Sequence, residues 1–189
     1  GTKTSDFTKV VDNLVPDEIL HQGSLLHFKY GKEKCFIWFA GLQLLNTARI
    51  FTNVVPLLKE RKISLLIVQD NKRMMSLAGF GVFPDLETSI QGLGNILATL
   101  GYAQYATSAG SGSGLAALIY GCRLNVKGIY GINALTQLPE DKPAVNQQAL
   151  HHRNKIFKNV DLPQLDSYEY IRNAPNTKIF LNYSKNSKF

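Results

Sequence analysis

The sequence has few of the features that mark membrane, secreted or metal-binding proteins. It contains two cysteines, Cys35 and Cys122, in 189 residues, and neither has the spacing of a metal-ligand set. No stretch approaches the roughly 18 consecutive apolar residues that cross a bilayer. The first residues also lack the charged segment and apolar core of a signal peptide. We therefore expect a reduced, cytoplasmic chain with no membrane span, no bound metal and no cofactor.

Basic residues are in excess, but they do not gather in the sequence. The chain carries 21 Lys+Arg against 14 Asp+Glu, which gives a net charge of +7. Such an excess favours nucleic-acid binding when the charges lie on one face. Here they occur in short groups, at 59–62, 72–73 and 153–155, between neutral stretches and without interleaved aromatic residues. We interpret them as solvated surface and expect no nucleic-acid partner.

The length of the chain favours one domain. We expect an N-terminal arm over residues 1–23, with a short helical turn after Pro16, and a single domain over 24–189. Apolar runs at 24–30 and 35–40 predict two strands, which we interpret as an antiparallel hairpin. Further strands are predicted at 64–69, 102–108, 126–132 and 178–183, and helices at about 46–62, 85–100 and 113–123.

Helices and strands therefore alternate after residue 41. Pro56 is expected to kink the first helix, and Gly101 to end the second. Strands that are apolar on both faces favour a mostly parallel sheet with helices on both faces, so the predicted class is α/β. Residues 136–176 contain four prolines. We interpret them as a lid-like excursion with one short helix at about 146–157.

One motif carries chemistry. Residues 109–113, Ala-Gly-Ser-Gly-Ser, connect a buried strand directly to a helix. A nucleophile on so tight a turn needs small residues two positions to either side, and Ala109 and Ser113 provide them. Gly110 and Gly112 add backbone freedom. The N-terminus of the helix stabilises negative charge beside Ser111, which makes Ser111 the candidate nucleophile.

Two other glycine-rich motifs compete with this interpretation. A phosphate-binding P-loop requires Gly-Lys-Ser/Thr after its spacer, whereas Gly114 is followed by leucine and alanine. A dinucleotide site needs an acid at the end of the next strand, and that strand ends in Ile132-Asn133-Ala134. Neither alternative has the residues that its chemistry requires.

The residues after two successive strands resemble those of a known group of proteins. Asp70-Asn71-Lys72-Arg73, with Gly79, precedes the segment Ser111-Gly112-Ser113-Gly114-Leu115-Ala116-Ala117-Leu118. Over residues 35–183 this order resembles the α/β-hydrolase superfamily, and more closely bacterial hydrolase-like domains that occur alone or beside glycan-related modules. The resemblance implies a serine hydrolase of carboxylesterase or acyl-ester type.

The same resemblance implies roles for individual residues. Ser111 would be the nucleophile, and the backbone amides of Gly112 and Leu42 would form the oxyanion hole. Asp70 and Arg73 would contact substrate or pair with each other. Ser113 departs from the family, which has glycine at this position.

The family's catalytic acid and histidine follow strands that this sequence does not contain, since it stops at Phe189. We therefore expect a C-terminally incomplete hydrolase domain, with the acid and base beyond Phe189. Within the chain, His151 or His152, with Asp161 or Asp166, are substitute candidates, or they are polar residues of the excursion. Of these, His152 is the candidate base.

Two functions remain open at this point. The first is hydrolysis of a small-molecule or glycan acyl ester. The second is a non-catalytic domain that binds a glycan or a protein partner through the pocket above Ser111. A truncated sheet would also expose an edge strand, which favours association with a second copy of the chain.

Overall fold

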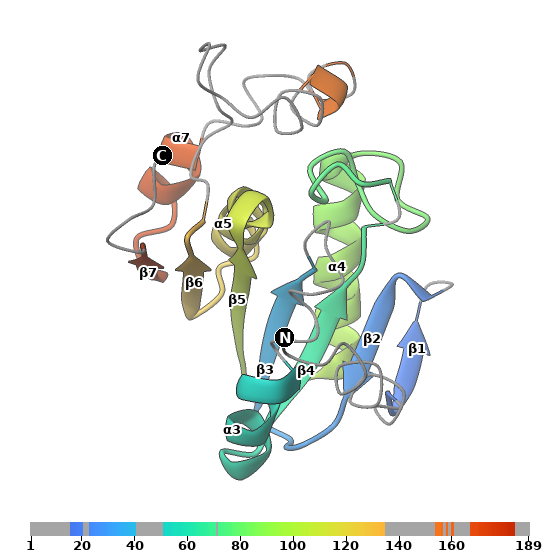
Figure 1. Cartoon of the computed structure of the whole chain (residues 1–189), viewed down its shortest axis with the longest axis vertical. Helices are drawn as coiled ribbons and strands as arrows, with labels where there is room; N and C mark the ends of the chain where they lie inside the picture. Colours follow the sequence, from blue (N-terminus) through green and yellow to red (C-terminus); the bar gives the residue numbers. More distant parts are fainter. Residues whose placement is uncertain are drawn as a thin grey trace, which may run out of the picture.

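The protein is organised around one seven-stranded sheet (Figure 1). A computed structural model describes residues 16–20, 23–40, 51–70, 72–134, 154–156, 158, 160 and 167–183. The strands are β1 (Glu18–Leu20), β2 (Leu25–Phe28), β3 (Lys34–Phe39), β4 (Ile63–Val68), β5 (Gln104–Gly110), β6 (Gly128–Ile132) and β7 (Lys178–Asn182). Their spatial order is β1-β2-β4-β3-β5-β6-β7, with β1 and β7 at the two edges.

The sheet is mostly parallel, as predicted. Strands β4, β3, β5, β6 and β7 run parallel to one another, whereas β2 is antiparallel to β4 and β1 is antiparallel to β2. The predicted hairpin of β2 and β3 is wrong, because β4 lies between them and pairs with both. Residues Leu65–Val68 are fully buried on both sides of β4. An apolar run of this kind belongs in the interior of the sheet, although the sequence does not say between which strands.

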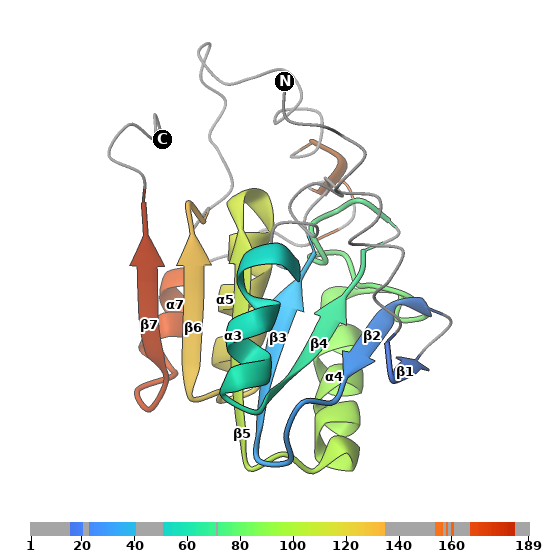
Figure 2. The same cartoon turned by 60° about the horizontal axis from the view of Figure 1, so that its bottom comes forward.

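Helices cover both faces of the sheet (Figure 2). They are α3 (Val55–Glu60), α4 (Leu86–Leu100), α5 (Gly114–Arg123) and α7 (Ser167–Arg172). α3 packs on one face, where Val55 and Leu58 join Trp38, Leu65 and Ile67. α4 and α5 pack on the opposite face in the larger core cluster. Alternate residues of β3 and β4 thus point into different clusters, as the pleat of a strand requires.

Local signals fix the ends of two helices. The Asp85 carboxylate accepts a hydrogen bond from the Thr88 backbone N–H at 2.8 Å and caps the start of α4. Gly101 ends the same helix in the left-handed conformation, with φ 69°. Helical residues 51–53 are interrupted at Val54, and Pro56 lies in the first turn of α3. Proline is compatible with a first turn, so Pro56 begins a helix after a break.

Two segments differ from the prediction. Glu18, expected in a helical turn of the N-terminal arm, lies in strand β1, which pairs with β2. Within the predicted excursion, Ser167–Arg172 form α7. Tyr170 and Ile171 of this helix pack against Leu118 and Cys122 of α5. α7 therefore covers the sheet between β6 and β7 in the way of an ordinary crossover helix. The lid interpretation stays a prediction for the residues that precede α7, most of which lie outside the described ranges.

Candidate functional site

Ser111 lies on a sharp turn between β5 and α5. The strand ends at Gly110, the 3₁₀ turn η2 spans Ser111–Ser113, and α5 follows at once. Figure 1 shows β5 running directly into α5. Ser111 is exposed and has a φ of 53°. This left-handed conformation costs a residue with a Cβ about 1–2 kcal/mol, and strain of this kind clusters at functional sites.

Small residues around Ser111 allow other parts of the chain to approach closely. A Cβ on Gly112 would lie 2.6 Å from Met75 Cε, and a Cβ on Gly114 would overlap Ala134. The buried Ser113 hydroxyl donates to the Ala40 carbonyl at 3.4 Å. The small residues that the sequence places at this turn are therefore required by packing as well as by the turn itself.

The first backbone N–H groups of the helical segment formed by η2 and α5 have no hydrogen-bond acceptor within that segment. The first N–H groups of any helix lack intrahelical partners, and this group includes the amide of Gly112. Leu42, the predicted second donor, lies outside the described residues. Its loop nevertheless begins beside the turn, because β3 ends at Phe39 and the next carbonyl, that of Ala40, accepts the Ser113 hydroxyl. The Ser111 hydroxyl has no hydrogen-bond partner among the residues that the structure describes.

Asp70 organises the loop that follows β4. Its carboxylate accepts three backbone N–H groups, from Lys72 at 2.9 Å, Met74 at 2.6 Å and Ser76 at 2.8 Å. Arg73 is exposed, and in the described part of the chain it forms no ion pair with Asp70. The predicted Asp70–Arg73 pair is therefore wrong, because backbone amides already surround the carboxylate. This geometry gives Asp70 a positioning role in the loop.

The same loop is attached to the turn at Ser111. Arg73, Met75 and Ser76 all have left-handed φ values between 55° and 58°. Met75 is buried and contacts Gly112, and Tyr120 of α5 donates to the Ser76 carbonyl at 2.9 Å. Asp70 thus holds a strained loop whose side chains pack beside Ser111. Met74 and Met75 both belong to the larger core cluster.

Lys72 reinforces this loop through its side chain. Its ammonium group donates to the carbonyls of Ala78, Phe83 and Pro84 at 3.1, 2.7 and 3.1 Å. Three neutral acceptors satisfy the three ammonium protons. Part of the basic group at 72–73 therefore has a structural function that the sequence did not indicate.

The candidate base and acid residues cannot be placed. His151, His152, Asp161 and Asp166 lie outside the described residues. Within the described ranges the single histidine is His27, which lies in β2 and is buried between Glu18 and Tyr102. The same ranges contain no group of three His, Cys, Asp or Glu side chains that could hold a metal ion.

The Glu18–His27–Tyr102 cluster was missed by the sequence analysis. One signal was available, because His27 occupies an inward position of β2 between Leu25 and Phe28, both buried. A buried polar side chain in such a position needs a partner. Its partners come from the predicted arm and from the connection between α4 and β5, so nothing local in the sequence identifies them.

Both cysteines are buried free thiols. Burial raises the pKa of Cys35 to about 12 and that of Cys122 to about 11. Because the thiolate is the reactive form, neither residue is prepared for nucleophilic or metal-binding chemistry at neutral pH.

The arrangement of strands and helices defines the α/β-hydrolase fold, and solved structures share it. Thermogutta terrifontis esterase 2 phosphonylated by sarin matches 86% of this chain and 79% of its own, with a TM-score of 0.53 and 10% identity. MGS-MChE2, an α/β-hydrolase enzyme from the metagenome of Mar Chica lagoon sediments, matches 89% of this chain and 88% of its own, with a TM-score of 0.50 and 16% identity.

A third neighbour comes from an assembly. The Glycosylation Associate Protein (Gap123) complex from Streptococcus agalactiae matches 86% of this chain with a TM-score of 0.55 and 15% identity. This chain spans about a third of that one, because 34% of the neighbour is covered. No protein-family model and no curated protein matches the sequence. At these identities the comparisons establish the fold.

Among the described residues, no helix is both long and apolar enough to cross a membrane.

Proposed function

We propose that this protein is a serine hydrolase that cleaves an acyl ester of a small molecule or a glycan, with Ser111 as its nucleophile. The observation that carries the proposal is the exposed Ser111 in a left-handed conformation, on a strand-to-helix turn with small neighbours. A strained turn of this kind presents a serine Oγ at the top of the sheet in α/β hydrolases.

The chemistry follows from that placement. Ser111 Oγ attacks the ester carbonyl carbon while a histidine accepts its proton. The backbone N–H groups of Gly112 and Leu42 stabilise the oxyanion that forms. The histidine then protonates the leaving alcohol, and water releases the acid from the acyl-enzyme. His152 is the candidate base in this chain. Asp70 supports the site indirectly, since it holds the loop that packs on Gly112.

The fold neighbours guide the choice of probe. Thermogutta terrifontis esterase 2 has been obtained phosphonylated by sarin, and a phosphonylating reagent reacts with an activated serine. We therefore choose a fluorophosphonate with a fluorescent tag as the probe of Ser111, applied to the folded protein and followed by peptide mapping.

Two variants separate Ser111 from its neighbour. The Ser111→Ala protein should lose all labelling, because it lacks the Oγ that attacks the phosphorus of the probe and displaces fluoride. The matched control is Ser113→Ala, which removes a buried hydroxyl two residues away and should keep the label. If the wild-type protein stays folded and unlabelled, or if Ser111→Ala is labelled as well as wild type, the proposal is wrong.

A second candidate is a non-catalytic domain that binds a protein partner. It is supported by the neighbour from a multi-protein complex and by exposed aromatic residues on the sheet face opposite α5. Tyr130 of β6 and Phe180 of β7 stack with ring centroids 5.1 Å apart, and both are about half exposed. If the partner is a second copy, sedimentation should show dimers that Phe180→Asp dissociates. A wild-type chain that remains monomeric at high concentration would contradict self-association.

A further inference from the structure

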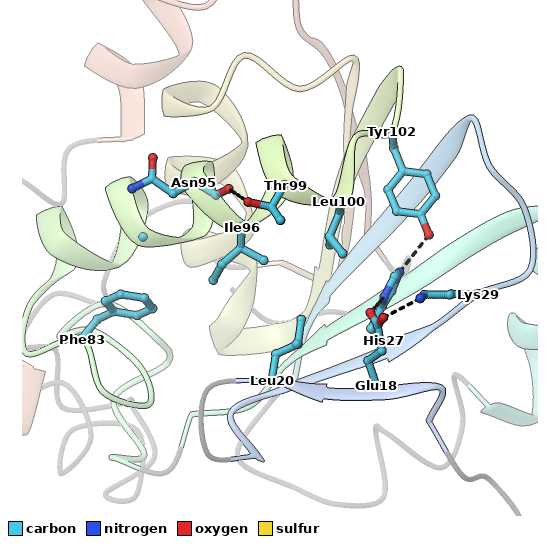
Figure 3. A pocket seen from close by; sticks show the side chains of 11 residues that line it. Glu18, Leu20, His27, Lys29, Phe83, Asn95, Ile96, Thr99, Leu100 and Tyr102 are labelled. Carbon is cyan, nitrogen blue, oxygen red and sulfur yellow. Dashed lines mark hydrogen bonds and ion pairs between the residues drawn. The ribbon is translucent and has the colours of Figure 1, made fainter.

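A second concave site lies between α4 and the β1–β2 edge of the sheet (Figure 3). This cleft has a volume of about 660 Å³, within the usual range of small-molecule sites. Its lining includes no residue of the turn at Ser111. One part is mainly apolar and is formed by Leu20, Phe83, Ile96 and Leu100, with Asn95 and Thr99 of α4 beside it. The other end is polar and is formed by Glu18, His27, Lys29 and Tyr102.

A buried histidine organises the polar end. His27 is 1% exposed; its Nδ1 lies 2.8 Å from Glu18 Oε2 and its Nε2 lies 2.9 Å from Tyr102 Oη. A carboxylate only accepts hydrogen bonds, so Nδ1 donates to Glu18. When the ring carries one proton, Nε2 is an acceptor and the Tyr102 hydroxyl donates to it. The oxygen of Tyr102 also has a hydrogen-bond contact with the Ser64 hydroxyl, and its second lone pair remains for a ligand.

Two groups of opposite charge pair at this end of the cleft. Lys29 Nζ forms an ion pair with Glu18 Oε1. Hydrogen bonds from Lys29 and His27 lower the pKa of Glu18, and burial raises the pKa of Tyr102. Among the groups that line this end, the Glu18 carboxylate and the Lys29 ammonium group therefore have opposite charges, and the Tyr102 phenol is neutral at neutral pH. A ligand carboxylate is attracted by Lys29 but repelled by Glu18, and a ligand ammonium group is attracted by Glu18 but repelled by Lys29. A charged ligand therefore gains little net attraction.

This end of the cleft offers a ligand both hydrogen-bond donors and a hydrogen-bond acceptor. An ammonium group has three N–H donors, and Glu18 accepts one of those of Lys29. Tyr102 provides one remaining acceptor lone pair. A hydroxyl group both donates and accepts, so it fits between them as neither a pure donor nor a pure acceptor does. The apolar walls suit an alkyl chain or a ring, whose burial supplies most of the binding free energy.

We propose that this cleft binds a neutral amphiphile, an apolar chain or ring that ends in a hydroxyl group, with the hydroxyl held by Lys29 and Tyr102. The site stands independently of the proposed chemistry at Ser111, since the two share no lining residue. His27 and Glu18 act as positioning residues, because they set the direction of the Tyr102 hydroxyl and fix Lys29.

Three probes with the same eight-carbon chain and different head groups test the expected preference for a hydroxyl group. Binding of octan-1-ol, octanoate and octylamine to the full chain is measured by calorimetry at neutral pH, below the concentrations at which the probes aggregate. Octan-1-ol should bind about tenfold more tightly than either charged probe, because only its head group keeps every hydrogen bond paired. Equal affinities for the three probes, tighter binding of octanoate or octylamine, or no binding of octan-1-ol would overturn the proposal.

Charge variants should redirect this preference. Lys29→Met leaves the Glu18 charge unpaired, so octylamine should become the tightest probe. Glu18→Gln leaves the Lys29 charge unpaired, so octanoate should. The matched control is Lys178→Met, on the edge strand at the far side of the sheet, which should keep the wild-type order. Unchanged preferences in folded Lys29→Met and Glu18→Gln proteins would refute the role of the pair. The wild-type ranking remains decisive if either variant fails to fold.

Discussion

Replacing Ser111 by glycine should stabilise the protein while abolishing its reaction with a fluorophosphonate. Ser111 has a φ of 53°, a conformation that costs a residue with a Cβ about 1–2 kcal/mol and costs glycine almost nothing. Glycine also gives the unfolded chain more freedom, which offsets about 0.4–1 kcal/mol of that gain. The expected net increase in the free energy of unfolding is about 0.5–1 kcal/mol.

Alanine at the same position separates strain from the loss of the hydroxyl. Ser111→Ala keeps the Cβ and its strain, and the exposed hydroxyl has no partner in the described part of the chain. Its stability should therefore stay within about 0.5 kcal/mol of wild type. Urea unfolding followed by circular dichroism measures both variants. Thermal midpoints should differ between them by roughly 2–4 °C, as expected for about 1 kcal/mol in a chain of this length.

A site far from Ser111 calibrates the measurement. Lys62 has the same φ of 53° and is exposed between α3 and β4, so Lys62→Gly should show a similar gain with unchanged fluorophosphonate labelling. The reasoning fails if Ser111→Gly is no more stable than Ser111→Ala while Lys62→Gly is stabilised. That result would mean that Ser111 is not held in a strained conformation.

Three further predictions concern packing, the thiols and pH. Gly121→Ala should lower the free energy of unfolding by about 1–3 kcal/mol through overpacking, since its Cβ would lie 2.5 Å from Thr107 Oγ1. In Gly94→Ala the new Cβ meets only the end of a leucine side chain at 3.2 Å, so the free energy of unfolding should be unchanged or rise by up to about 1 kcal/mol through helix propensity. Urea unfolding of both variants checks this difference. Ellman's reagent should leave both thiols unmodified in the folded protein and titrate two in denaturant, whereas rapid labelling of folded protein would contradict their burial. Hydrogen bonds lower the folded-state pKa of Glu18 below its ordinary value of 4.5. The ionised carboxylate therefore contributes fully to stability above that pH, and the contribution is lost as the pH falls through the folded-state pKa. In Glu18→Gln the free energy of unfolding should fall less steeply at acid pH, and an identical pH dependence in both proteins would argue against the pairing.

Local features of this chain could be predicted because they depend on neighbours in sequence. Asp85 and Gly101 mark the ends of α4 through their own hydrogen bonding and backbone freedom. The small residues around Ser111 predict a tight turn because bulky side chains would collide there, and the structure places a left-handed Ser111 on that turn. The alternation of apolar strands and helices likewise predicts a mostly parallel α/β sheet.

Long-range relations could not be obtained in this way. β4 lies between β2 and β3. Its fully buried residues show that both of its faces are covered, but hydrophobicity does not determine which strands pair with it. A carboxylate at the end of a strand is a plausible substrate contact from sequence. The fold of the loop after β4 instead brings three backbone N–H groups around the Asp70 carboxylate.

The sequence alone was enough to place most of the described helices and strands and to pick out the serine on the strained turn, because propensity, capping and close packing act over a few residues. Only the tertiary structure decided which strands are neighbours and which polar groups meet. His27 and Tyr102 are 75 residues apart, and they form one site because the connection between α4 and β5 lies beside β2 in the folded chain. Such a contact depends on the packing of the whole chain, which no short stretch of sequence specifies.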